Sequence, residues 1–194
     1  MLGLVKRPAL TLSAAFDRMW DHIRDEWEGY SHDQIRMKRN VYLKAIRHFN
    51  EGVGKIDLYD IERSHAMTFR DWWIDRKNTL GLQPHTANRE INCLRRLLNV
   101  IYDIDGIDGT NPFLRVRIKA EPKKRRAPLT SEQIKNNLLA PGKLEGLHND
   151  FQILIKLIIN TGMRPVEAVG LSLGDIFLSD SVPYVYVRRN EIRA

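Results

Sequence analysis

The sequence predicts a mainly α-helical chain, in which an N-terminal four-helix bundle precedes a smaller α+β unit that ends in a β-hairpin. Apolar residues recur at three- and four-residue spacing in four segments before residue 105, which is typical of helices with one buried face. After residue 172 the pattern changes to segments rich in valine and tyrosine, as strands prefer. The 194 residues suffice for one large domain or two small ones, and 43% of them are hydrophobic, enough for a packed core.

The first two helices are expected over residues 10–27 and from residue 31 to the glycines after residue 51. The first carries a stripe of aromatic and aliphatic side chains, and either Thr11 or Ser13 suits its N-cap. The second opens on Ser31, whose spacing to Gln34 is that of a capping box. Both apolar stripes are expected to face a common core.

The third and fourth helices are expected over residues 63–77 and 84–102, after a short connector at residues 55–61. Thr86 suits the N-cap of the fourth helix. The single cysteine, Cys93, lies on the apolar face of this helix, so it is expected in the core and not as a nucleophile. One cysteine also excludes an internal disulfide and fits a reducing cytoplasm.

Several basic side chains of the second and fourth helices lie off the apolar stripes. They are Arg36, Lys38, Arg39 and Lys44 in the second helix, and Arg89, Arg95 and Arg96 in the fourth. A basic helix side fits a DNA-facing surface, but it fits a solvated face equally well.

Most of the net charge of +7 is concentrated in one short segment. Residues 113–130 carry seven basic side chains against one acid, whereas residues 1–112 are nearly neutral. The basic residues are Arg115, Arg117, Lys119, Lys123, Lys124, Arg125 and Arg126. Such a segment is the electrostatic footprint expected for contact with a phosphate backbone. A solvated linker or a targeting-like run is the alternative. We expect residues 113–128 to link a domain at 1–112 to one at 129–194.

The second unit is predicted to open with a helix that Thr130 and Gln133 cap reciprocally. The apolar run at residues 151–160 predicts a buried helix, and residues 175–178 and 184–188 predict the two strands of a hairpin.

The segment TGMRPVEAVGL at residues 161–171 predicts a helix, a break and a second helix. Gly162 suits the left-handed residue that ends a helix, and Pro165 suits the first turn of the next one. Arg164 lies between them, where a forked cation beside free backbone N–H groups suits an anion such as a phosphate. Glu167 follows by one helical turn and is placed to hold or orient the arginine.

Thr161, Gly162, Arg164, Glu167 and Leu171 together resemble the T-G-x-R-x-x-E-x-x-x-L motif of the tyrosine recombinase (phage integrase) family. The resemblance implies that Arg164 is the first of two arginines that clamp the scissile DNA phosphate, with Glu167 beside it. It also implies that the bundle is a SAM-like core-binding domain that clasps duplex DNA, and that a partial α+β catalytic domain follows. Several of the basic residues listed above for the second and fourth helices are then expected to contact DNA phosphates. An ordinary helix end with a surface Arg–Glu pair is the alternative.

The family's reaction is a transesterification through a 3′-phosphotyrosyl intermediate, which needs no metal or other cofactor. The other groups that the resemblance implies are a second arginine, a lysine on a hairpin, histidines and the nucleophilic tyrosine. No H-x-x-R sequence occurs, and only Tyr184 and Tyr186 follow Arg164, both within a predicted strand. We therefore expect a fragment that binds DNA without cutting it.

Three functions remain open from the sequence. The first is the DNA-binding part of a site-specific recombinase or integrase that binds double-stranded DNA, with self-association on DNA as in the family's tetramers. The second is a non-enzymatic DNA-binding or regulatory integrase relative, and the third is a helical protein-interaction module. No segment is long and apolar enough to span a membrane, and no signal peptide is recognisable, so a cytoplasmic location is expected.

Overall fold

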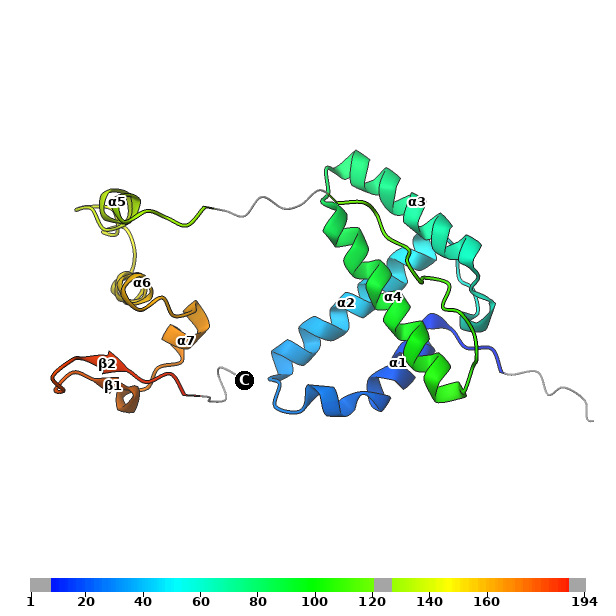
Figure 1. Ribbon diagram of the computed structural model, residues 1–194, viewed down its shortest axis with the longest axis horizontal. Coiled ribbons are helices and arrows are strands. Elements are labelled where there is room, and N and C mark those ends of the chain that lie inside the picture. Colours follow the sequence, from blue (N-terminus) through cyan, green and yellow to red (C-terminus); the bar gives the residue numbers. More distant parts are fainter. Residues whose placement is uncertain (1–7, 121–126, 189–194) are drawn as a thin grey trace, which may run out of the picture. The chain divides into compact units, whose positions relative to one another are not determined.

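The computed structural model describes residues 8–120 and 127–188. The chain forms two compact units, residues 1–122 and 123–194, which are described separately (Figure 1). The first is helical, and the second combines short helices with a two-stranded antiparallel sheet. The predicted mainly α fold with a hairpin near the C-terminus is confirmed. No helix among the described residues has the length and apolar character needed to cross a membrane.

The helical unit is arranged around its last helix, which packs against the other three. Its elements are α1 (Leu12–His22), the 3₁₀ turn η1 (Arg24–Trp27), α2 (His32–Gly52), the 3₁₀ turn η2 (Leu58–Asp60), α3 (Arg63–Leu80) and α4 (Pro84–Asp105). The four predicted helices are therefore present, although the first gives way to a 3₁₀ turn after His22.

Helix caps explain where these elements begin. The Thr11 hydroxyl accepts from the Ala14 N–H (3.2 Å), and Ser31 and Gln34 form the predicted capping box. The prediction for Thr86 was wrong, because α4 begins two residues earlier at Pro84. Proline suits a first helical position, where no intrahelical partner for its missing N–H is needed.

The core of the helical unit is closed and aromatic. Phe16, Phe49, Phe69 and Trp73 are at most 1% exposed, and the rings of Phe49 and Phe69 lie 5.4 Å apart. Phe113 packs against both phenylalanines although it lies beyond the four helices. The helical unit thus continues past residue 112, where the sequence predicted its end and the start of a linker.

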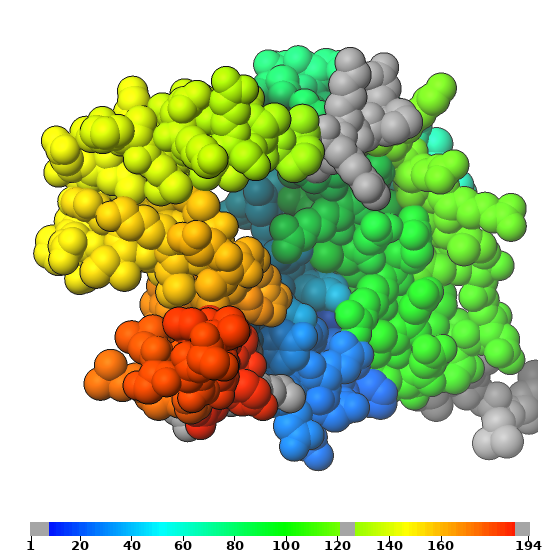
Figure 2. All heavy atoms as spheres, turned by 60° about the vertical axis from the view of Figure 1, so that its left-hand side comes forward, coloured from blue at the N-terminus to red at the C-terminus, as the bar shows by residue number. Residues whose placement is uncertain are grey.

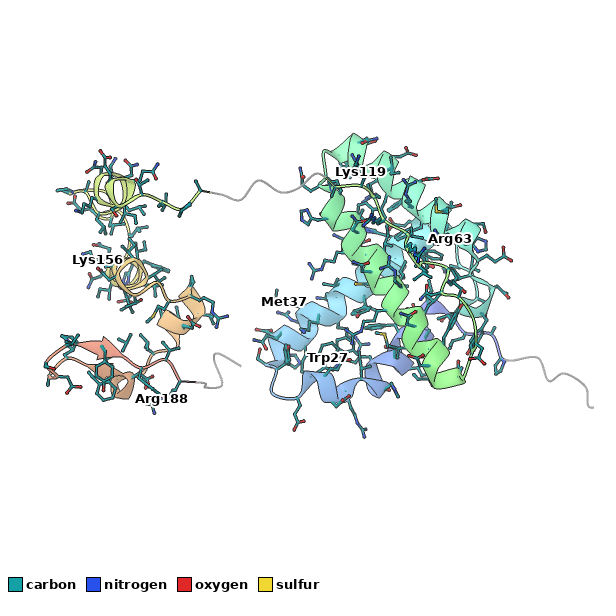
Figure 3. All side chains as sticks on the ribbon, viewed as in Figure 1. Trp27, Met37, Arg63, Lys119, Lys156 and Arg188 are labelled. Atoms are coloured by element: carbon teal, nitrogen blue, oxygen red, sulfur yellow. The ribbon has the colours of Figure 1, made fainter. Side chains whose placement is uncertain are left out.

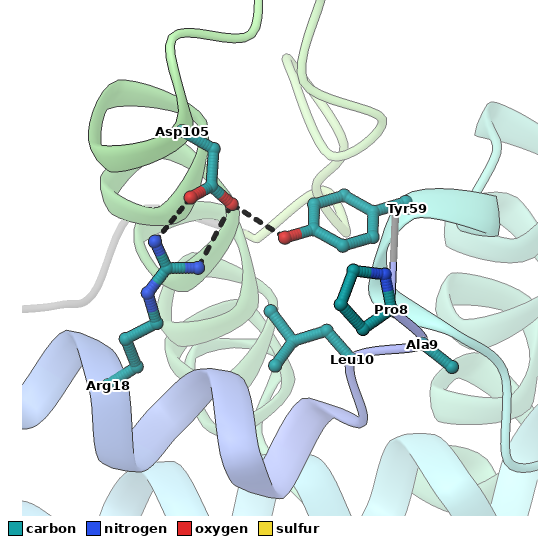
Figure 4. A pocket seen from close by; sticks show the side chains of 6 residues that line it. All are labelled: Pro8, Ala9, Leu10, Arg18, Tyr59 and Asp105. Atoms are coloured by element: carbon teal, nitrogen blue, oxygen red, sulfur yellow. Dashed lines mark hydrogen bonds and ion pairs between the residues drawn. The ribbon is translucent and has the colours of Figure 1, made fainter. Parts of the chain in front are cut away.

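Two polar links tie distant helices together. In the core, His48 of α2 and Glu90 of α4 lie 2.7 Å apart, and each is less than 5% exposed. At the bundle's edge, Arg18 of α1 pairs with Asp105 of α4, which also accepts a hydrogen bond of 2.6 Å from the Tyr59 hydroxyl (Figure 4). Burial of His48 and Glu90 is tolerated because each is the other's partner.

The second unit is built from short elements. They are α5 (Ser131–Gln133), the π-helical turn η3 (Ile134–Leu138), α6 (Asn149–Thr161), α7 (Pro165–Val169), the 3₁₀ turn η4 (Leu173–Asp175), β1 (Ile176–Phe177) and β2 (Tyr184–Val185). Thr130 and Gln133 form the predicted capping box, and the strands pair with Phe177 opposite Tyr184. Both strands are shorter than predicted.

The apolar helix α6 is not buried, contrary to the prediction from its sequence. None of its residues is buried, and Phe151 and Ile153 are 60% and 56% exposed. Its main neighbour in the described part of the unit is the five-residue α7. A helix with apolar residues on most sides needs neighbours on most sides, and α7 is too short to cover it.

Candidate phosphate-binding turn and nucleic-acid interface

The turn between α6 and α7 has the helix–break–helix geometry that the sequence predicts. Gly162 ends α6 in the left-handed conformation (φ 69°), and its N–H donates to the Ile158 carbonyl (2.8 Å). Met163 then turns inward and is 9% exposed. Arg164 takes the N-cap position of α7 and Pro165 the first helical position. The arginine is therefore placed beside the N-terminus of a helix.

Glu167 holds Arg164 by both backbone and side chain. Its carboxylate accepts from the Arg164 backbone N–H (2.7 Å), from Nε (2.8 Å) and from Nη2 (2.5 Å). These hydrogen bonds raise the pKa of the Arg164 guanidinium. Glu167 is 17% exposed at its side chain and Arg164 is 78% exposed.

This pairing orients the arginine. Because the carboxylate engages one edge of the guanidinium fork, the opposite edge is turned toward solvent, where its donors suit an anionic oxygen. Nη1 makes no hydrogen bond with any residue in the described part of the chain. The turn can therefore present a pre-oriented cation to a phosphate.

A second anchored group lies just after this turn and was not recognised from the sequence. Asp175 is 1% exposed and accepts from the Ser172 N–H and hydroxyl (both 2.8 Å), and Arg188 pairs with it. These hydrogen bonds lower the pKa of the Asp175 carboxyl. The Tyr186 N–H donates to the Asp175 carbonyl (2.8 Å), which attaches the hairpin. The signal was available, because Ser172 and Asp175 have capping-box spacing.

On α2, most of the predicted DNA contacts have partners within the protein. Arg36 pairs with Asp33 (3.0 Å) and Arg39 with Asp17 of α1 (2.8 Å). The Lys38 ammonium lies over two aromatic rings, 4.8 Å from the Trp27 centroid and 4.3 Å from that of Tyr30. Lys44 is exposed.

On α4, the structure separates three arginines that the sequence grouped together. Arg89 is exposed, and Arg96 pairs with Glu26 (2.5 Å), which raises the pKa of Arg96. Both line a surface hollow of about 490 Å³. Arg95 instead donates to the Phe113 carbonyl (2.9 Å) and the Val116 carbonyl (2.8 Å).

The basic segment after α4 is divided as well. Residues 113–120, hereafter the strap, lie along the helical unit, beside α4 (Figure 2). Arg115, Arg117 and Lys119 are exposed on it, and Lys119 is labelled in Figure 3. The predicted contacts at Lys123, Lys124, Arg125 and Arg126 lie outside the described residues.

Comparison with known proteins identifies the fold. The structure is similar to that of lambda integrase, solved as a tetramer bound to a Holliday junction, with a TM-score of 0.64 and 18% identity over 92% of this chain and 51% of that one. It is also similar to the Tn1549 transposon integrase bound to circular intermediate DNA, with a TM-score of 0.63 and 19% identity over 91% of this chain and 54% of that one.

A further structure of the Tn1549 integrase, bound to transposon right end DNA, matches with a TM-score of 0.61 and 18% identity. That match covers 94% of this chain and 58% of the integrase, so the chain spans little more than half the length of these structures. No family sequence model matches the chain, and neither does the sequence of any curated protein. At this identity the likeness establishes an integrase-like fold.

Proposed function

We propose that this chain is the DNA-binding portion of a site-specific tyrosine recombinase or integrase. The observation that carries the proposal is the Arg164 turn, whose arginine is held by Glu167 with one edge of its guanidinium turned outward. The integrase-like fold and the concentration of basic charge in residues 113–130 support it.

The helical unit supplies most of the DNA affinity in this proposal. Arg89 and Arg96 at the hollow on α4, with Arg115, Arg117 and Lys119 on the strap, contact phosphates of duplex DNA. Lys123, Lys124, Arg125 and Arg126 extend this contact along the backbone. Arg36, Lys38, Arg39 and Lys44 of α2 remain candidate contacts, although ion pairs and aromatic rings engage the first three.

Arg164 contributes to chemistry more than to affinity. It binds a non-bridging oxygen of the scissile phosphate and stabilises the charge that develops as a tyrosine hydroxyl attacks and a 3′-phosphotyrosyl bond forms. The attacking tyrosine and the other catalytic groups come from sequence outside these 194 residues. Self-association on DNA, and action on DNA in the cytoplasm, belong to the same proposal.

Covalent trapping on a nicked DNA substrate tests the proposal. The full-length product of the gene is expected to form a protein–DNA adduct that survives denaturation, and Arg164→Ala is expected to reduce its formation at least 100-fold. Lys143→Ala, which removes another exposed cation of the second unit, serves as the matched control and is expected to retain the adduct. Normal trapping by Arg164→Ala would remove this arginine from the mechanism.

The second candidate is a non-enzymatic DNA-binding relative of the integrases, which the integrase-like fold and the basic segment at residues 113–130 fit as well. It predicts that the full-length protein binds DNA and yields no adduct. A protein-interaction module, in contrast, predicts no salt-dependent affinity for DNA.

A further inference from the structure

The strap is fixed to the helical unit by side chains that bond to its backbone. The Asn88 amide of α4 donates to the Ile118 carbonyl (2.9 Å), and its oxygen accepts from the Ile118 N–H (2.8 Å). Arg95 lies two helical turns further along the same face of α4 and donates to the Phe113 and Val116 carbonyls. Asn88 thus pairs with the strap as a neighbouring β-strand would.

The other long edge of the strap is held by α3. The Arg63 guanidinium donates to the Pro112 carbonyl (2.9 Å) and the Leu114 carbonyl (2.5 Å), and Arg70 Nε donates to the Arg117 carbonyl (3.1 Å). Four side chains from two helices therefore fix residues 112–118 through the backbone, which leaves the exposed side chains of Arg117 and Lys119 available.

From Arg115 to Lys119 the strap's side chains alternate between solvent and core. Val116 and Ile118 are 2% and 6% exposed, whereas Arg117 and Lys119 are exposed. In an extended backbone, residues two apart point to the same side and are separated by about 6.6 Å. The two cations thus form a short row at a fixed spacing on the outer side.

This row is continuous with the basic hollow on α4. Ala120, the residue after Lys119, lines that hollow together with Arg89 and Arg96. The Asn88 side chain lines it too, while it bonds to Ile118. The strap and α4 therefore form one positively charged surface within one compact unit.

We propose that Asn88 and Arg95 are positioning residues, which fix the strap so that Arg117 and Lys119 contact neighbouring phosphates of one DNA strand. This inference rests on the proposed DNA binding and deepens it, because it assigns a subsite. Neither Asn88 nor Arg95 contacts DNA in this arrangement. Each acts through the strap backbone, because a strap ordered before binding loses little conformational freedom when DNA is bound.

A double-mutant cycle tests the positioning role in the full 194-residue chain. Binding to a labelled duplex of arbitrary sequence is measured by fluorescence anisotropy over a range of salt concentrations. Arg117→Gln with Lys119→Gln is expected to reduce the salt slope by about 1.8, because two phosphates are no longer neutralised. Asn88→Ala alone is expected to weaken binding roughly tenfold. Added to the double variant, it is expected to weaken binding less than twofold, because the contacts it positions are already absent.

Hydrogen exchange at the Ile118 amide supplies the readout that is independent of DNA. Slow exchange in the parent chain and fast exchange in Asn88→Ala are expected, with α4 still protected. Asn88→Asp keeps the acceptor for this amide but loses the donor to the Ile118 carbonyl, so it is expected to give an intermediate exchange rate. Asn88→Leu, which removes both hydrogen bonds without adding a charge, replaces Asn88→Ala in the binding cycle if that variant does not fold. Arg95→Lys, which cannot form the same fork to two carbonyls, tests the second residue in the same way.

The control variant is Asn78→Ala, which changes an exposed asparagine of α3 whose side chain accepts a hydrogen bond from Lys77. This variant is expected to bind DNA with the affinity of the parent chain. The positioning role is overturned if the parent chain binds DNA and Asn88→Ala binds equally well. It is also overturned if Asn88→Ala weakens binding equally in the parent chain and in the Arg117→Gln, Lys119→Gln variant. In both cases the proposed function stands. If the parent chain does not bind duplex DNA, both fall together.

Discussion

The two units of this chain differ in how far their apolar sequence is covered. In the helical unit, Phe49 is completely buried between α2, α3 and the strap. In the second unit, Phe151 belongs to a more apolar helix and is nevertheless 60% exposed. Apolar composition alone therefore does not bury a helix, and neighbours on several sides are also required.

The difference extends to the polar groups. The helical unit uses long-range pairs, such as His48 with Glu90 and Asn88 with Ile118, to connect segments far apart in the chain. The second unit has mostly local pairs three residues apart, such as Arg164 with Glu167 and Ser172 with Asp175, and its longer pair joins Arg188 to Asp175 within the hairpin region. The long-range pairs can fix an extended surface such as the strap, whereas the local pairs fix individual turns.

A matched pair of phenylalanine truncations gives the largest expected contrast. Phe49→Ala is expected to lower the free energy of unfolding of the helical unit by about 3–5 kcal/mol, because it opens a cavity in a closed core. Urea denaturation followed by tryptophan fluorescence measures it, since all four tryptophans lie before residue 74.

Phe151→Ala is expected to change the stability of the second unit by no more than about 0.5 kcal/mol, because its ring is already in contact with water. Hydrogen exchange of the α6 amides measures this effect. A loss of protection comparable to that caused by Phe49→Ala in the helical unit would show that α6 is covered, and would contradict the comparison.

Cys93 of α4 is partly buried and packs against the core of the helical unit, so its reactivity reports on that packing. Burial raises the pKa of the thiol to about 11, so at pH 8 the reactive thiolate is roughly 100-fold scarcer than for an ordinary cysteine. Slow labelling by iodoacetamide in the native chain and fast labelling in urea are expected. Equal rates in both conditions would show that α4 is not packed as described.

The pH dependence of the hairpin tests the second unit, whose apolar residues are less covered. Its effect is the smallest of those predicted here. The hydrogen bonds from Ser172 lower the pKa of Asp175 in the folded state. The ionised carboxylate therefore stabilises the turn above its ordinary pKa, and this stabilisation is lost as the pH falls through the lowered value. The protection factor of the Tyr186 amide against hydrogen exchange is expected to be constant at higher pH and to fall only below about pH 4. Asp175→Asn should remove that sensitivity.

Local features of this structure could be predicted from the sequence. The capping boxes at Ser31 and Thr130, the helix end at Gly162 and the Arg164–Glu167 pair all depend on residues within one helical turn. Their geometry follows from chain connectivity alone, so residue type and spacing are sufficient.

Features that depend on distant partners could not be predicted in this way. Arg95 has the same sequence context as Arg96, yet it faces the strap because Phe113 and Val116 return to α4. Arg39 appeared available for DNA, but Asp17 lies beside it across a helix–helix contact. The strap was expected to be a linker because its many basic residues indicated an exposed segment. The apolar residues between them, which attach the strap to the core, were not recognised.

The salt dependence of DNA binding tests the central claim most directly. The 194-residue chain and a variant with Lys123, Lys124, Arg125 and Arg126 changed to glutamine are titrated with a labelled duplex between 50 and 200 mM salt, a range chosen as roughly that over which binding to phosphates weakens strongly. We predict steeply salt-dependent binding by the parent chain. The slope in the variant is expected to be lower by up to about 3.6, or about 0.9 for each phosphate that is no longer neutralised. Binding that is absent, or that does not change with salt, would contradict the account.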